Sequence, residues 1–99
     1  MPTLHILSNS PFADDRLQSC LSLLSDGDGL LLCGEAVQAL RPGSALFAAL
    51  DDLAKRAALH ALAEDLAARG LAPPAWVRSV DYPEFVELCC RYARTNTWL

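Results

Sequence analysis

The stretch TLHILSNSPFADDRLQSC, residues 3–20, decides how the rest of the chain is arranged. Residues 4–7 form an extended apolar run, and residues 8–11 contain the Ser, Asn and Pro that are typical of a tight turn. An amphipathic segment follows directly. The stretch therefore predicts a strand, a short loop and a helix, which together make the first half of a β-α-β unit.

The predicted first helix covers about residues 11–24. Ser10 is placed to cap it, Pro11 suits its first turn, and Asp14 and Asp15 complement the helix dipole. Apolar residues recur at near-helical spacing and predict a buried stripe. The stripe consists of Phe12, Leu17, Cys20, Leu21 and Leu24.

The remaining chain alternates strand-like and helix-like segments. Residues 30–33 follow an Asp/Gly turn and are uniformly apolar, as in an interior strand of a parallel sheet. The further predicted elements are a helical turn over 35–40, a strand over 76–80, a helix over 82–91 with Asp81 as N-cap and Pro83 in its first turn, and an edge strand over 95–98. In the helix over 82–91, the residues predicted to face the sheet are Phe85, Val86, Cys89 and Cys90. The alternation predicts an α/β fold, a three-layer α/β/α sandwich with a mainly parallel sheet.

Several of these patterns resemble the DsrH/TusB family, which are small subunits of bacterial sulfur-relay complexes. Leu4-His5 is followed by Ser10-Pro11-aromatic and then by a cysteine within the helix, and the chain ends close to Trp98, as in family members. Three later stretches agree as well, so the resemblance covers nearly the whole length. They are residues 30–32, 62–71 and 80–86.

The resemblance implies a single domain over residues 1–99 with a five-stranded, DsrE-like and flavodoxin-like sheet. Propensity and resemblance disagree over residues 44–69, which read as one long Ala/Leu helix by propensity alone. The resemblance implies instead a helix over 44–55, a strand over 57–63 and a helix over 64–68, ended by Gly70. We follow the resemblance here. It also implies that a tryptophan near the chain end, Trp98, is docked on the sheet edge or a partner.

Composition limits the classes of function. The 53% apolar content exceeds the roughly 45–50% of soluble domains, which suggests a buried subunit interface, although an Ala/Leu composition bias would give the same value. A net charge of −4 without a basic cluster argues against direct nucleic-acid binding. Neither a signal peptide nor an apolar run long enough to span a membrane is visible. We therefore expect a cytoplasmic protein whose four cysteines are reduced.

Candidate sites lie where chemistry usually sits in an open parallel sheet, at the carboxyl ends of the strands. Residues 8–10 lack a Gly-rich phosphate fingerprint, so a turn and cap is favoured over an anion site. Cys33 is favoured as core filler, Glu64 and Asp65 as carboxylates at a helix amino end, and Asp81 as a cap. No cofactor motif or zinc spacing is present, so we expect neither a cofactor nor a metal.

His5 and His60 each fall in a predicted strand. A buried, hydrogen-bonded histidine is favoured at both positions over a ligand or a base. Cys20 is the candidate catalytic residue, as an auxiliary sulfur acceptor. Its place in the apolar stripe favours a packing role instead, because burial raises the pKa of a thiol. Both interpretations of Cys20 stay open.

The resemblance also implies a function. Sister subunits that accept sulfur carry their persulfide-forming cysteine near the third strand–helix junction, and this chain has no cysteine between Cys33 and Cys89. The resemblance therefore implies a non-catalytic or auxiliary subunit of a hetero-oligomer with sister subunits of the TusC/TusD or DsrF/DsrE type. Such a complex passes persulfide sulfur to a small sulfur-carrier protein and on to 2-thiouridine at the tRNA wobble position. The alternatives are a DsrH-type subunit in dissimilatory sulfur oxidation, a sulfurtransferase using Cys20, and an unrelated helical adaptor.

Overall fold

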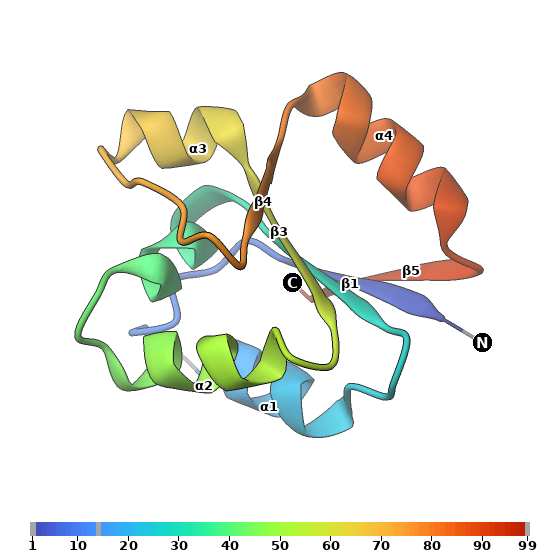
Figure 1. The fold of residues 1–99 in the computed structure, drawn as a ribbon, viewed down its shortest axis with the longest axis horizontal. Helices are drawn as coiled ribbons and strands as arrows, with labels where there is room; N and C mark the ends of the chain where they lie inside the picture. The colour runs from blue at the N-terminus through green and yellow to red at the C-terminus, as the bar shows by residue number, and fades with distance from the viewer. Residues whose placement is uncertain (1, 14, 99) are drawn as a thin grey trace.

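A computed structural model describes residues 2–13 and 15–98, and Figure 1 shows a sheet with helices on both sides of it. The elements follow one another as strand, helix and strand, as the sequence predicts. In chain order they are β1 (Thr3–Leu7), α1 (Arg16–Leu23), β2 (Gly29–Leu32), the 3-10 helix η1 (Gly34–Leu40), α2 (Ala45–Leu53), β3 (Ala58–Leu62), α3 (Ala63–Ala68), β4 (Arg78–Val80), α4 (Tyr82–Arg91) and β5 (Arg94–Trp98).

The sheet has the strand order β4-β3-β2-β1-β5, and every neighbouring pair is parallel. The chain adds β2, β3 and β4 on one side of β1 and then returns to place β5 on the other side. β5 is thus an edge strand, as predicted. Its register sets Leu7 opposite Trp98 and His5 opposite Asn96.

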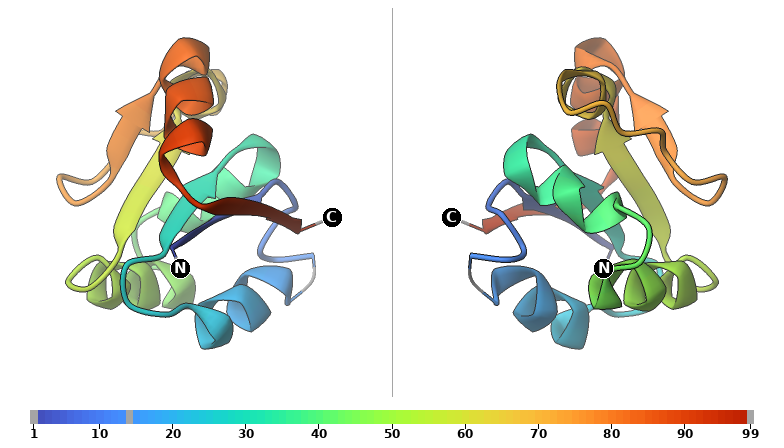
Figure 2. Two further views of the ribbon diagram at one scale, coloured as in Figure 1. Left: turned by 90° about the vertical axis from the view of Figure 1, so that its right-hand side faces the viewer. Right: turned by 90° about the vertical axis from the view of Figure 1, so that its left-hand side faces the viewer.

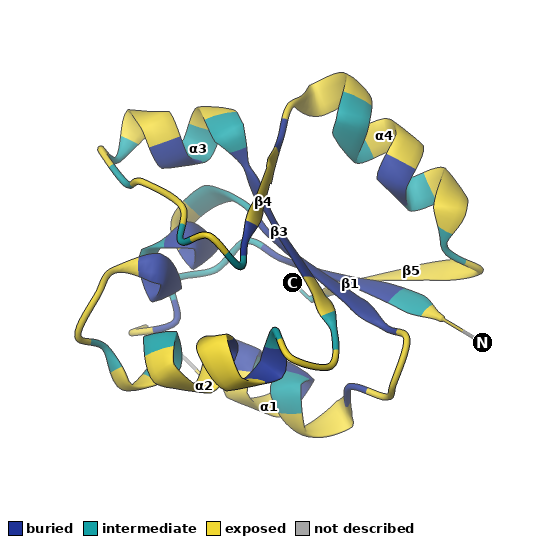
Figure 3. Ribbon diagram, in the orientation of Figure 1, coloured by how far each residue is buried: buried dark blue, intermediate teal, exposed yellow. Residues whose placement is uncertain are grey.

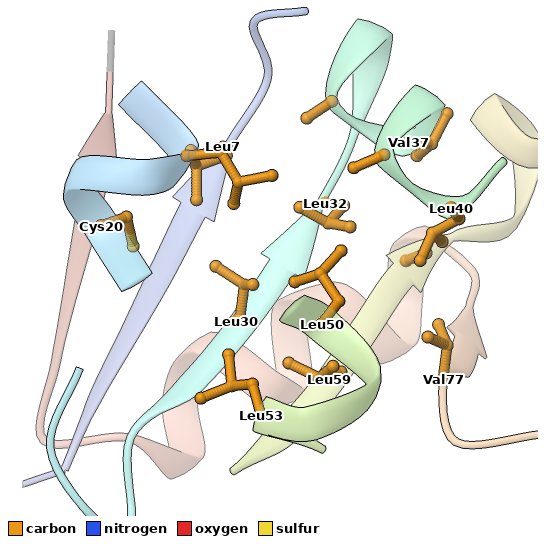
Figure 4. Packing of buried hydrophobic residues seen from close by; sticks show 14 of the residues in the cluster. Leu7, Cys20, Leu30, Leu32, Val37, Leu40, Leu50, Leu53, Leu59 and Val77 are labelled. Carbon is orange, nitrogen blue, oxygen red and sulfur yellow. The ribbon is translucent and has the colours of Figure 1, made fainter. Parts of the chain in front are cut away.

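Helices cover both faces of the sheet, which confirms the predicted three-layer α/β/α sandwich (Figures 1 and 2). α1, η1 and α2 pack on one face and α4 packs on the other, each over its own apolar cluster. The first cluster contains Leu7, Leu17, Cys20, Leu30, Leu32, Val37, Leu40, Leu50, Leu53 and Leu59, among others (Figure 4). The second contains Leu4, Ile6, Leu31, Leu62, Val80 and Leu88. Because β2 is covered on both sides, all four of its residues are buried, which explains its uniformly apolar sequence (Figure 3).

The strand implied within residues 44–70 is present as β3, so tertiary pairing overrides the helix propensity of its alanines. β3 lies between β2 and β4, and four of its five residues are buried. The preceding helix α2 begins where Ser44 accepts a hydrogen bond from the Phe47 amide at 3.0 Å. Gly70 adopts a φ of 64° just after α3, as expected of a residue that ends a helix.

The predicted start of the first helix is wrong. α1 begins at Arg16, about five residues after the predicted start, because residues 11–13 form a separate turn in which the Ala13 amide donates to the Ser10 carbonyl at 3.2 Å. The Ser10 hydroxyl accepts from Phe12 N at 3.3 Å, so it caps this turn and not the helix. Phe12 is 62% exposed and does not belong to the buried stripe. The predicted role of Asp14 lies outside the described residues.

The C-terminal helix α4 has the predicted bounds and cap. The Asp81 carboxylate accepts from the Glu84 amide at 2.8 Å while Glu84 accepts from the Asp81 amide at 3.1 Å, which forms a capping box. The predicted sheet-facing set is partly wrong, because Val86 is 61% exposed and Cys90 is also exposed. The face toward the sheet is formed by Phe85, Leu88, Cys89 and Tyr92.

β4 is also shorter than predicted. The strand covers only Arg78–Val80, because the Val77 amide donates to the Pro74 carbonyl in a turn just before it. Trp76 instead packs edge-on against Phe47, with ring centroids 5.3 Å apart. Within residues 2–13 and 15–98, no helix is long and apolar enough to cross a membrane.

Candidate functional site

The carboxyl end of the sheet gathers Cys33, which follows β2, and Asp65 in the first turn of α3. The Gly34 amide donates to the Asp65 carboxylate at 2.8 Å, and the Cys33 thiol lies 3.4 Å from the Leu7 carbonyl. Burial, and then the negative charge of Asp65, raises the pKa of the Cys33 thiol. Because the thiolate is the nucleophile, this arrangement disfavours sulfur chemistry at Cys33 and supports the predicted structural role.

Gly34 is needed at this junction for two reasons. Its φ is 52°, which favours glycine, and a Cβ there would lie 3.1 Å from the Ser8 carbonyl oxygen. The loop after β1 and the start of η1 therefore approach each other closely.

Arg69 connects two helices at the same end of the sheet. Its guanidinium donates to the Glu35 carboxylate at 2.9 Å and to the Asp65 carbonyl at 3.1 Å, and it lies 3.8 Å from the Asp65 carboxylate. These contacts tie α3 to η1. This role of Arg69 was not predicted from the sequence, although a basic residue four positions after Asp65 on a helix is a visible signal for an ion pair.

Cys20, the predicted sulfur acceptor, lies on the α1 side of the sheet, pointing into the first apolar cluster (Figure 4). It is fully buried beside Leu17 and Leu24, as the predicted stripe requires. Burial, followed by the negative charge of Asp28, raises the pKa of Cys20 to about 12. At neutral pH the thiol is therefore protonated and shielded from solvent.

A buried polar array lies on the same face of the sheet, and its central residue, Asp28, was not predicted from the sequence. Its two carboxylate oxygens accept from the Thr3 amide at 2.9 Å and the Ser25 amide at 3.0 Å, and the second lies 3.4 Å from Nε2 of His5. Burial acts to raise the pKa of Asp28, but these hydrogen bonds and the interaction with His5 outweigh it and lower that pKa below its ordinary value. The signal that could have identified Asp28 in the sequence is its position directly before an apolar strand.

Trp98 completes this array. Its indole N–H donates to Nδ1 of His5 at 3.2 Å, so Nε2 of His5 carries the proton that points toward Asp28. The predicted docking of Trp98 on the sheet edge is confirmed, and the predicted hydrogen-bonded state of His5 is confirmed as well. Leu99 lies outside the described residues. The array links the last strand to β1 and to the turn before β2.

His60 lies on the opposite face, under α4. It is only 7% exposed, and neither ring nitrogen has a hydrogen-bond partner among the residues that the structure describes. The prediction of a hydrogen-bonded histidine is therefore wrong at this position. A cavity of about 20 Å³ borders the ring, and Arg78, Glu84, Glu87 and Arg91 line it as well; we call it the His60 pocket. Burial, and then the charges of Arg78 and Arg91, lowers the pKa of His60.

The remaining two thiols lie on α4. Cys89 is half-buried against the second apolar cluster, and burial followed by the neighbouring Cys90 raises its pKa. Cys90 is exposed, and all four cysteines are free thiols. Within the described part of the chain, no three His, Cys, Asp or Glu side chains are grouped to hold a metal ion.

The fold is shared with two solved structures. The ychN protein from Escherichia coli superposes with a TM-score of 0.81 over 99% of this chain and 100% of its own, at 18% identity. A protein of unknown function, MTH1491 from Methanobacterium thermoautotrophicum, gives a TM-score of 0.73 over 98% of this chain and 97% of its own, at 16% identity. At such low identity these likenesses establish the fold alone.

Sequence relatives are more informative. "Protein TusB" from Erwinia tasmaniensis is 41% identical over 99 residues, covering 96% of this chain and 99% of the relative. Proteins of the same name from Escherichia coli O81 and Shigella flexneri are 36% and 35% identical, with the same coverage. The family model described as "DsrH like protein" matches residues 9–95. Because that match spans most of the chain and the relatives match it almost from end to end, the chain belongs to the DsrH family, together with the proteins named TusB.

Proposed function

We propose that this chain is a subunit of a cytoplasmic sulfur-relay hetero-oligomer that passes persulfide sulfur toward 2-thiolation of the tRNA wobble uridine. The observation that carries the proposal is the near full-length match, at 35–41% identity, to proteins named TusB. The TusB names favour this branch over a DsrH-type role in dissimilatory sulfur oxidation. The complex would hold homologous sister subunits and deliver sulfur to a small carrier protein.

Within that complex, we propose that the chain is a structural subunit and that Cys20 serves packing. The burial of Cys20 and its pKa of about 12 support this, because a reactive thiol needs access and a lowered pKa. Cys33 and Cys89 also have raised pKa values. The carboxylates Glu64 and Asp65 stand at the start of α3, where a thiolate would be disfavoured by their charge.

Thiol labelling tests the structural role directly. In the isolated chain, a small alkylating agent at pH 7, followed by mass spectrometry, should modify the exposed Cys90 first and leave Cys20 unmodified until the chain unfolds. Cys90→Ser should remove the fast phase and is the matched control. Fast labelling of Cys20, together with uptake of sulfur by Cys20 from a persulfide donor, would overturn the structural role.

A genetic test addresses the pathway. In a host that lacks its own TusB-type gene, the chain and the sister-subunit genes beside it should restore 2-thiouridine, measured in digested tRNA by mass spectrometry. Cys20→Ala should restore a similar level, because it removes the thiol and leaves only a cavity the size of one sulfur atom. Full thiolation in the absence of the chain, or no restoration by wild type, would contradict the proposed pathway.

We further propose that the outer face of α4 binds a sister subunit. Tyr82 and Val86 are 50% and 61% exposed, and with the exposed Cys90 they follow one another at intervals of four residues along one helix face. Exposed apolar residues that adjoin one another in this way are typical of interaction sites. Leu23, which is 64% exposed at the end of α1, supplies a matched control. Val86→Asp should prevent formation of the complex in native mass spectrometry while Leu23→Asp leaves it intact; the reverse result would place the interface on α1.

A further inference from the structure

The His60 pocket has unused hydrogen-bonding capacity. The cavity lies between β3, β4 and α4, and its volume of about 20 Å³ suits a single water-sized group. His60 is more than nine-tenths buried, yet both of its ring nitrogens lack partners among the described residues. Buried polar groups in folded proteins are nearly always hydrogen-bonded, so an orphaned imidazole beside a cavity points to an occupant.

Two of the side chains that line the cavity with His60 carry only hydrogen-bond donors. Arg78 comes from β4 and Arg91 from the last turn of α4, and both border the cavity. Each guanidinium has five N–H donors and no acceptor, and a neutral imidazole adds one more N–H. The positive charges of both arginines act on the His60 ring and disfavour its protonated form. A ligand for this site should therefore bring negative charge and acceptor atoms.

Two carboxylates at the rim compete only weakly for the arginines. Glu84 uses one oxygen to accept from the Asp81 amide, and its other oxygen lies 3.7 Å from Arg78. Glu87 is 69% exposed and lies 3.9 Å from Arg91. Long, solvent-exposed ion pairs of this kind contribute little, so both guanidiniums retain donors for a ligand.

We propose that the His60 pocket binds a small free oxyanion. One oxygen enters the cavity and accepts the N–H of His60, while the remaining oxygens lie at the open mouth and accept from Arg78 and Arg91. Negative charge beside the ring favours the imidazolium, so binding takes up a proton. The affinity should therefore rise as the pH falls through the His60 titration.

NMR titration of the full-length chain tests this, with His5 as an internal reference. Sulfate and acetate are added in separate arms, against sodium chloride at equal ionic strength. We expect saturable shifts of the His60 ring resonances and a higher pH midpoint for His60, with His5 unchanged. Tighter binding of acetate than of sulfate would identify a carboxylate as the preferred class. Shifts that do not saturate, or that chloride reproduces, would overturn the proposal.

Matched variants locate the effect. Arg78→Gln and Arg91→Gln should each weaken binding about tenfold, because each removes a charged donor. Arg94→Gln, an exposed arginine on β5, removes the same charge elsewhere and should leave the affinity unchanged. His60→Leu should abolish the saturable shifts at the arginine side chains. If Arg94→Gln weakens binding equally, the anion binds through nonspecific charge attraction and not in the His60 pocket, and the proposal is overturned.

Discussion

His5 and His60 are almost equally buried, at 6% and 7% exposure, yet their surroundings are opposite. His5 points to the α1 face of the sheet, where its two nitrogens meet Trp98 and Asp28. His60 points to the α4 face, where neither nitrogen meets a partner among the described residues. The strand register explains the separation, because His5 is paired with Leu30 whereas His60 is paired with Leu31, the next residue along β2.

The difference teaches that burial alone does not define the role of a polar side chain. At His5, the carboxylate of Asp28 in the turn before β2 and the indole of Trp98 at the end of β5 contact the same ring. At His60, the short strand β4 and the helix α4 leave a cavity and two arginines instead. The first arrangement is complete within the chain and stabilises the fold, whereas the second is incomplete and is suited to binding.

The largest effect is expected at the carboxylate of the complete site. Asp28→Ala should lower the free energy of unfolding by about 3–5 kcal/mol, because it leaves two backbone amides and the His5 N–H without an acceptor in the interior. Asp26→Ala, two residues away and solvent-exposed, is the control and should change stability by less than about 0.5 kcal/mol. Urea unfolding followed by circular dichroism measures both. Equal losses of unfolding free energy in the two variants would show that the hydrogen bonds of Asp28 do not stabilise the fold.

The two histidines should respond with opposite signs to the same substitution. His5→Leu should cost about 2–3 kcal/mol, because Asp28 and Trp98 both lose a buried partner. His60→Leu should stabilise the isolated chain by about 1 kcal/mol in chloride buffer, because it removes polar atoms that lack partners. Denaturant midpoints measured side by side decide this. Destabilisation of similar size by both substitutions would show that the two histidines do not differ in their contribution to stability.

Much of the fold was predictable from local signals. The apolar run of β2, the capping residue Asp81 and the α4 bounds all follow from sequence chemistry, and α4 spans Tyr82–Arg91 as expected. The strand β3 did not follow from propensity, since its Ala and Leu residues favour a helix; only family resemblance predicted it. The delayed start of α1 was missed because Ser10 and Pro11 suit a helix start and an isolated turn equally well.

The polar sites were harder to predict because they depend on long-range contacts. The partners of His5 lie 23 and 93 positions away in sequence, at Asp28 and Trp98. No local pattern distinguishes His5 from His60, since each stands between apolar residues in a strand. The difference emerges only when the strand order places β5 beside β1 and leaves β4 at the opposite edge.

A milder substitution should make the complete site resemble the incomplete one. Trp98→Phe keeps an aromatic ring on the sheet edge but removes the N–H that donates to Nδ1 of His5. The expected loss is about 1 kcal/mol, the typical net value of one hydrogen bond. NMR of the His5 ring should show a changed Nδ1 resonance, because Nδ1 no longer accepts the indole N–H, while the Asp28 carboxylate keeps the proton on Nε2. An unchanged Nδ1 resonance and unchanged stability would show that packing alone docks Trp98.

The smallest expected effect is the pH dependence that His60 confers. Its pKa is lowered in the folded chain by burial and then by Arg78 and Arg91, whereas in the unfolded chain it has the ordinary value of about 6.5. Between these two pKa values the unfolded state binds more protons than the folded state. Stability should therefore fall as the pH decreases below about 6.5, and it should level off below the folded pKa.

Unfolding in chloride buffers between pH 7.5 and pH 4.5 should show this loss in wild type, and a smaller one in His60→Leu. The contribution of Asp28 falls in a separate, more acidic range, because its stabilisation is lost only as the pH drops below its ordinary value of about 3.8. An identical pH profile for wild type and His60→Leu above pH 4.5 would show that the orphaned ring titrates as it does in the unfolded chain.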